Sequence, residues 1–91
     1  MQVRLSPRLL EDRDRLFAFL VELSPTAAER AMAVLSEALT DLGAFPRIGK
    51  PGPPGYRRLV VRFGQAGYEI RYRVYPDRVF VTRIFHVREN R

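Results

Sequence analysis

The sequence contains no cysteine and a single histidine, His86, among its 91 residues. A chain without thiols forms no disulfides, has no cysteine nucleophile and offers no thiolate to a metal. One imidazole cannot build the histidine clusters that transition metals prefer. The expectation is therefore a protein with no metal site and no cofactor.

Long apolar runs are missing as well. No segment approaches the ~20 apolar residues that a membrane-spanning helix needs, and residues 1–5 lack the apolar core of a signal peptide. We therefore expect a cytoplasmic protein without a membrane partner. The length suits a single domain over residues 1–91, and 46% hydrophobic with 29% charged residues is typical of a chain that folds around a core.

Basic charge is concentrated in the second half of the chain. Residues 1–42 carry five basic and seven acidic side chains, whereas residues 43–91 carry eleven basic and three acidic ones, a net charge of +8. Fifteen of the sixteen basic residues are arginine, whose planar guanidinium forms paired hydrogen bonds with phosphate or carboxylate. This pattern predicts an anion-binding surface in the second half; the alternative is that the arginines are ordinary solvated charges.

Two serine–proline pairs mark the starts of two helices. Ser6-Pro7 and Ser24-Pro25 each place an N-cap serine before a proline at the first helical position. Apolar residues recur at helical spacing behind each pair, and Gly43 stands where a glycine often ends a helix. We predict an antiparallel helix hairpin over about residues 7–42, joined by a loop of one or two residues.

Residues 43–55 contain four prolines and four glycines, which exclude a regular element. We interpret this segment as a connector between the helix hairpin and a sheet. The alternative is a proline-rich recognition segment.

Alternating apolar and polar residues over about 56–88 predict a sheet. Three runs, at residues 58–63, 68–75 and 79–85, are separated by short turns, so they form an antiparallel meander. Near the N-terminus, Val3 and Leu5 alternate with polar neighbours and predict one more short strand. The fold class is therefore α+β: an N-terminal strand, an antiparallel helix hairpin, and a three-stranded antiparallel meander that completes one small sheet.

The predicted sheet has one face on the helices and one face rich in arginine. Arg83 does not fit this division, because strict alternation puts it on the buried side with Val79 and Val81. It must either have a charged partner there or be moved to the other face by a bulge. The arginine-rich face is expected to carry these residues: Arg58, Arg62, Arg71, Arg73 and Tyr75.

Five short motifs follow one another along nearly the whole chain. They are Ser24-Pro25 with Ala27-Ala28, Leu42 with Pro46 and Gly49, YRRLV at 56–60, GYEIRY at 67–72, and VFVTRIFHVR at 79–88. This ordered set resembles the RelE/ParE superfamily of toxins from bacterial type II toxin–antitoxin systems. The resemblance implies a compact basic toxin of a plasmid-stabilisation type module. It also implies a cognate antitoxin partner, with a homodimer or a toxin–antitoxin hetero-oligomer as possible assemblies.

The resemblance leaves two activities open, because RelE-like members cut messenger RNA in the ribosomal A site and ParE-like members poison DNA gyrase. The RelE-like pattern has two basic residues on the strand after the connector and an arginine on the next strand. It adds an arginine past the last strand and a tyrosine near the C-terminus. In such a site the cations hold the scissile phosphate while a base activates the ribose 2′-hydroxyl.

This chain matches the nuclease pattern in part. Arg58 fits the first basic position and Arg88 fits the arginine past the last strand, but Val60 and Glu69 stand at the other two positions. No tyrosine follows the last strand in this sequence. His86 could replace it as a base, since imidazole titrates near neutrality; alternatively, it is a strand-end residue bonded to nearby backbone.

The incomplete pattern favours a ParE-like inhibitor of DNA gyrase, which is not an enzyme and has no catalytic residues. Its target-binding residues are expected to be Arg71, Arg73, Arg83 and Arg88. The alternative is a RelE-like ribosome-dependent endoribonuclease that acts on messenger RNA through Arg58, His86 and Arg88. A further alternative is a non-enzymatic nucleic-acid-binding module, suggested by the basic second half.

Overall fold

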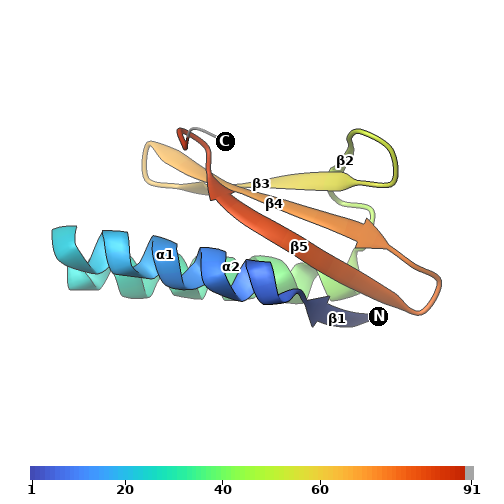
Figure 1. Ribbon diagram of the computed structural model, residues 1–91, viewed down its shortest axis with the longest axis horizontal. Coiled ribbons are helices and arrows are strands. Elements are labelled where there is room, and N and C mark those ends of the chain that lie inside the picture. Colours follow the sequence, from blue (N-terminus) through green and yellow to red (C-terminus); the bar gives the residue numbers. More distant parts are fainter. Residues whose placement is uncertain (90–91) are drawn as a thin grey trace.

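The computed structural model describes residues 1–89 and has the expected α+β architecture, with a sheet on one side and two helices on the other (Figure 1). The antiparallel helix hairpin and the three-stranded meander are both confirmed. Neither helix of the described residues is long and apolar enough to cross a membrane. The elements in chain order are β1 (Gln2–Leu5), α1 (Pro7–Leu23), α2 (Pro25–Ala44), β2 (Lys50–Pro51), β3 (Arg57–Phe63), β4 (Ala66–Val74) and β5 (Arg78–His86).

Both helices begin where the serine–proline pairs predict. The Ser6 hydroxyl oxygen accepts a hydrogen bond from the Leu9 amide at 3.0 Å, and the Ser24 hydroxyl oxygen accepts one from the Ala27 amide at 3.2 Å. Each serine thus satisfies an amide that the first helical turn leaves without a partner. Because Ser24 alone separates the two helices, they must turn back on each other.

The predicted end of the second helix at Gly43 is wrong. Helix α2 continues to Ala44 and is capped by Phe45. Gly43 is needed for close packing instead, since a Cβ at this position would lie 2.8 Å from the Met1 carbonyl oxygen. The proline-rich connector also contains an unexpected element, because β2 pairs with the start of β3.

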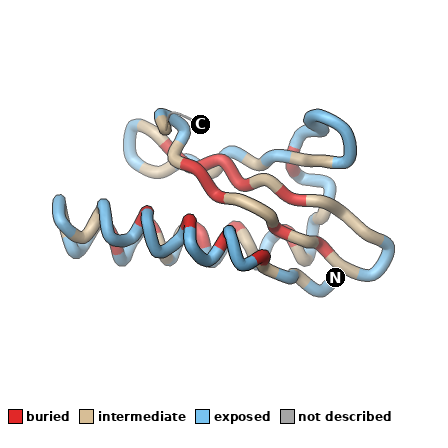
Figure 2. The backbone as a smooth tube through the Cα atoms, in the orientation of Figure 1, coloured by how far each residue is buried: buried red, intermediate tan, exposed pale blue. Residues whose placement is uncertain are grey.

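The sheet has five strands in the order β1-β5-β4-β3-β2 (Figure 1). Strands β3, β4 and β5 are antiparallel neighbours, while β1 pairs parallel with β5, so the sheet is mixed. The hydrophobic core lies between the sheet and the helices, where buried positions of both layers face each other (Figure 2). The largest side chains that are almost fully buried there include Tyr68, Tyr72, Leu9, Leu35 and Leu42.

A bulge in β5 determines which face of the sheet Arg83 occupies. Arg71 pairs with Arg83, but its neighbour Tyr72 pairs with Val81, so Thr82 is the extra residue. Two hydrogen bonds from Ser6 hold the bulge in place. The Ser6 amide donates to the Val81 carbonyl at 3.0 Å, and the Ser6 hydroxyl donates to the Thr82 carbonyl at 2.7 Å. The bulge turns Arg83 away from the core and onto the side of Arg71.

Candidate functional site

The face of the sheet that points away from the helices carries a row of arginines. Arg58 of β3, Arg71 of β4 and Arg83 of β5 lie opposite one another across three neighbouring strands. Arg73 projects from the same side of β4, two residues beyond Arg71, because side chains alternate along a strand. We call the surface formed by Arg58, Arg71, Arg73 and Arg83 the arginine face.

Aromatic rings hold three of these guanidinium groups in place. The Phe85 ring lies within 4.8 Å of the Arg71 guanidinium carbon and 4.5 Å of that of Arg83. The Arg73 guanidinium lies 4.6 Å from the centre of the Tyr56 ring. A stacked guanidinium keeps its N–H donors free at its edge and has less side-chain freedom to lose on binding. Stacking therefore orders these three guanidinium groups, although Arg71 Nε already donates to Glu69, and Arg83 Nε and Nη2 already donate to Asp12.

A buried carboxylate lies among these arginines. Glu69 is only 4% exposed, and its Oε2 accepts a hydrogen bond from Arg71 Nε at 2.7 Å. Its Oε1 lies 4.0 Å from Arg58 Nη1. A hollow of about 150 Å³ next to this group is lined by Tyr56, Arg58, Glu69 and Arg71 among others. The positive charge of the face is thus partly neutralised from within.

Asp12 of α1 fixes the edge of the arginine face. Its carboxylate is 2% exposed and accepts hydrogen bonds from Arg83 at 2.7 and 3.0 Å, from Arg15 at 2.8 Å and from the Ile84 amide at 2.9 Å. Burial alone would raise the pKa of Asp12, but the hydrogen bonds from Arg83, Arg15 and Ile84 outweigh burial, so the pKa lies below its usual value. The carboxylate is therefore charged at neutral pH and orients Arg83.

The role of Asp12 was missed by sequence reasoning, although one signal for it exists. Asp12 interrupts the buried stripe of α1 between Leu9 and Leu16. A carboxylate at such a position needs a partner, because a buried charge is stable only when it is paired. The sequence does not say that this partner is Arg83, 71 residues further along the chain.

His86 lies on the other side of the sheet, facing the helices. It pairs with Tyr68, a core residue, and the two rings meet edge to face at 5.6 Å. His86 also lines a cavity of about 430 Å³ with Leu16 and Leu20 of α1. The structure therefore does not bring His86 and Arg58 together.

Arg88 lies past the end of β5, away from the other three arginines predicted to bind a target. It lines the cavity that contains His86, and its backbone amide donates a hydrogen bond to His86 Nδ1 at 3.2 Å. Of the predicted set, Arg71, Arg73 and Arg83 share the arginine face and Arg88 does not. Within residues 1–89 there is no group of three or more acidic or histidine residues that could hold a metal ion.

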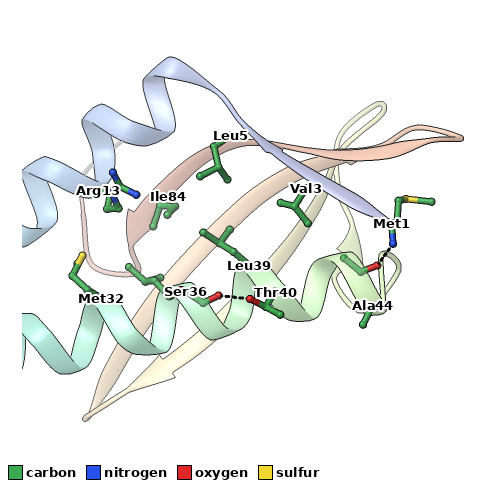
Figure 3. Close-up of a pocket in the computed structure, with 12 residues that line it drawn as sticks. Met1, Val3, Leu5, Arg13, Met32, Ser36, Leu39, Thr40, Ala44 and Ile84 are labelled. Carbon is green, nitrogen blue, oxygen red and sulfur yellow. Dashed lines mark hydrogen bonds between the residues drawn. The ribbon is translucent and has the colours of Figure 1, made fainter.

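An apolar groove opens on the helix side of the molecule, between β1 and α2 (Figure 3). Val3 and Leu5 of β1 point into the groove from one wall and Leu39 of α2 from the other, with Arg13 of α1 and Met32 of α2 further along (Figure 3). Its volume is about 960 Å³. Local sequence patterns could not reveal this groove, because its walls come from segments that are distant in the chain.

Residues 3–91 match the family described as ParE toxin of type II toxin-antitoxin system, parDE. Two curated proteins of Caulobacter vibrioides are similar to this chain over 89 residues. Toxin RelE3 is 37% identical, with 98% of this chain and 97% of that protein covered; Toxin RelE1 is 42% identical, with 98% and 96% covered.

Two solved structures have a similar fold. A chain of the chromosomal ParDE TA system from P. aeruginosa superposes with a TM-score of 0.82 at 24% identity, covering 96% of both chains. A chain of the intact E. coli RelBE toxin-antitoxin complex superposes with a TM-score of 0.62 at 22% identity, covering 97% of this chain and 98% of that one. At these identities the likeness shows the fold.

Proposed function

Because this chain belongs to the ParE toxin family of type II toxin–antitoxin systems, within the RelE/ParE superfamily, we propose that it is a ParE-like inhibitor of DNA gyrase, neutralised by a cognate antitoxin protein. One observation carries the proposal: Arg58 and His86 project from opposite faces of the sheet. This placement supports a toxin that acts by binding and not by cutting RNA.

The chemistry of RNA cleavage explains why the placement matters. A base must come within about 2.6–3.2 Å of the 2′-hydroxyl while cations contact the neighbouring phosphate. A cation and a base on opposite faces of a sheet cannot meet at one phosphodiester. Glu69 adds a negative charge beside Arg58 and Arg71, where a phosphate would otherwise be attracted.

The arginine face has the features of a protein-binding surface. Arginine and aromatic residues are enriched among the residues that dominate binding energy at interfaces. Here Arg71, Arg73 and Arg83 are stacked on aromatic rings, and the donors of Arg71 and Arg83 that do not bind Glu69 or Asp12 remain for a partner. We assign gyrase binding to these three arginines, with Arg88 as a separate contact at the end of the sheet.

Antitoxin binding is assigned to the apolar groove between β1 and α2, which offers a partner segment apolar surface to bury. The groove lies on the helix side, whereas the arginine face is on the other side of the sheet. A partner confined to the groove would leave the arginine face open. We therefore expect the antitoxin to continue around the molecule with an acidic segment that covers the arginines.

The second candidate is a RelE-like ribosome-dependent endoribonuclease. The names of the two curated relatives, Toxin RelE3 and Toxin RelE1, favour it. Such an enzyme would use His86 as the base and Arg88 as the phosphate ligand, since both line one cavity. Arg58 would lie outside that active site. A non-enzymatic nucleic-acid-binding module is the third candidate and is suggested by the charge of the arginine face.

Two reactions run side by side test the proposal. Purified protein is added to gyrase with relaxed plasmid, and separately to ribosomes programmed with messenger RNA. We expect loss of supercoiling, accumulation of cleaved gyrase–DNA complexes and intact messenger. Cut messenger with normal supercoiling would contradict the proposal and support the nuclease. If neither reaction changes, both of these candidates fail.

Arginine variants test whether the arginine face is the surface that inhibits gyrase. Arg73→Ala should require roughly tenfold more protein for half-inhibition of gyrase, because truncating an important interface arginine costs more than about 1 kcal/mol. Arg30→Ala on the exposed surface of α2 removes the same charge from the helix side and is the matched control. Equal inhibition by the two variants would mean that gyrase does not contact the arginine face at Arg73.

A further inference from the structure

We propose that Glu69 determines the specificity of the arginine face. Its carboxylate takes the place that a phosphate group would occupy between Arg58 and Arg71, and it thereby keeps nucleic-acid backbones off this surface. The inference rests on the arrangement of the arginine face alone. It does not depend on gyrase being the target.

The geometry around Glu69 is that of a bound anion. The hydrogen bond from Arg71 Nε to Glu69 Oε2 is 2.7 Å long, a distance typical of a charge-assisted bond. The other carboxylate oxygen faces Arg58 Nη1 at 4.0 Å. Val60 and Phe85, its neighbours on the adjacent strands, border the group on two sides. One carboxylate oxygen is thus hydrogen-bonded to Arg71 and the other lies at ion-pair distance from Arg58, so a single anion faces both arginines.

An internal carboxylate has an advantage over a phosphate from solution. Glu69 is held beside the arginines by its own strand, so its contact with them costs no translational entropy, whereas an external ligand loses translational entropy when it binds. A phosphate that entered the hollow next to Glu69 would also meet a like charge. Both effects reduce the affinity of Arg58 and Arg71 for phosphate.

The consequence is a basic surface that discriminates between two kinds of acceptor. Nucleic-acid binding grows with the number of phosphates that lysine or arginine residues contact. With Arg58 and Arg71 engaged by Glu69, fewer arginines remain for a backbone of evenly spaced phosphates. Arg73 is stacked on Tyr56 and presents its ordered donors to a protein partner.

The test replaces Glu69 by glutamine, which keeps the shape of the side chain and removes its charge. Asp77→Asn is the matched control, because it also removes one negative charge and one arginine ion pair, but at an exposed turn. The probe is a fluorescein-labelled single-stranded RNA of about 20 nucleotides, and its anisotropy is measured over a series of potassium chloride concentrations. We expect E69Q to bind at least about tenfold more tightly than the wild type, and D77N to stay within about twofold.

The salt dependence of RNA binding shows how many arginines the E69Q substitution frees from the Glu69 carboxylate. Each phosphate contact to a single strand adds about 0.7 to the slope of log affinity against log salt, so two released arginines should steepen the slope by about 1.4. E69Q binding that exceeds D77N binding by less than twofold would overturn the proposal. So would tighter binding with an unchanged slope, because no further phosphate would then be contacted.

A second arm uses Arg58→Ala, and its measurement in the wild-type background does not require E69Q to fold. Arg58 is largely exposed, so Arg58→Ala is a safe substitution. In the wild type it should change RNA affinity by less than twofold, because the Glu69 carboxylate 4.0 Å away already offsets the charge of Arg58. In the E69Q background it should remove about half of the gain in log affinity, because Arg58 is one of the two arginines that E69Q releases. A fivefold loss in the wild-type background would refute the proposal, since Arg58 would then contact phosphate in the presence of Glu69.

Discussion

Asp12 should be the charged residue whose loss costs this fold most. It ties α1 to β5 through Arg83 and through the Ile84 amide. In the Asp12→Ala variant, the Arg83 guanidinium, whose side chain is 23% exposed, loses its carboxylate partner. The buried Ile84 N–H group loses its acceptor at the same time.

The magnitude follows from these two losses. Removing one partner of a buried ion pair costs about 3–5 kcal/mol, and the partial exposure of Arg83 places it near the lower end. An unsatisfied buried amide costs about 1–3 kcal/mol, although the two costs overlap. We expect Asp12→Ala to lower the free energy of unfolding by about 4 kcal/mol, against a total of roughly 5–14 kcal/mol for a chain of this length. Asp12→Asn should lose about half as much, because its amide oxygen still accepts from Ile84.

The effect should also depend on pH. Because the pKa of Asp12 is lower in the folded protein than the ordinary value of 3.8, its charged form stabilises the fold. This contribution is fully present above the unfolded pKa and is lost as the pH falls through the folded pKa. The stability difference between the wild type and Asp12→Asn should therefore be constant from pH 7 to about 5 and shrink below about pH 4.

Urea unfolding followed by circular dichroism measures both effects. Asp14→Asn is the matched control, because Asp14 is an exposed carboxylate on the same helix, and its change should stay within about 0.5 kcal/mol. A loss below about 1 kcal/mol in Asp12→Ala would refute the reasoning. A difference in the free energy of unfolding between the wild type and Asp12→Asn that does not shrink in acid would refute the electrostatic part of the reasoning.

Three further predictions concern the core, the sheet and the antitoxin. Tyr72→Phe removes the hydroxyl that accepts a hydrogen bond from the Gly49 amide at 2.8 Å. It should lower the free energy of unfolding, measured in urea, by about 1–3 kcal/mol, whereas the control Tyr75→Phe should lower it by less than about 0.5 kcal/mol. Equal losses of stability in the two variants would contradict this prediction. Gly67→Ala should lower the free energy of unfolding by at least about 2 kcal/mol in the same urea assay, because its Cβ would collide with the Val61 carbonyl oxygen of β3. In the control Gly52→Ala the new Cβ meets nothing closer than 3.9 Å, so this variant should keep nearly the stability of the wild type. A purified cognate antitoxin at 100 times its Kd should stabilise the protein by about 2.7 kcal/mol and raise Tm by roughly 10 °C or more; an unchanged Tm would count against an antitoxin partner.

Local rules account for most of the predictable part of the fold. Ser6 and Ser24 start helices because a serine hydroxyl and a following proline favour that geometry wherever they occur. Alternation along β3 placed Leu59 toward the core and Arg58 toward solvent, as the structure confirms. Such rules involve neighbours in sequence, so a single chain suffices to apply them.

The features that sequence reasoning missed all depend on contacts between distant segments. Gly43 lies inside α2 and gives the N-terminal segment room to pass close to the helix, a contact that no helix-ending rule describes. The parallel pairing of β1 with β5 joins the two ends of the chain. Asp12 finds Arg83 only once α1 has packed along the edge of β5.

The bulge at Thr82 shows how one such contact controls the candidate site. With strict alternation, Arg83 would face the core and His86 would lie on the outer face of the sheet, the side that carries Arg58. The extra residue exchanges the two: Arg83 joins the arginine face and His86 turns toward the helices. Since Ser6 holds the bulge in place, a residue at the start of α1 decides whether this face carries a base or another cation. Which of these two side chains shares the arginine face therefore depends on strand register, which residue identities alone do not specify.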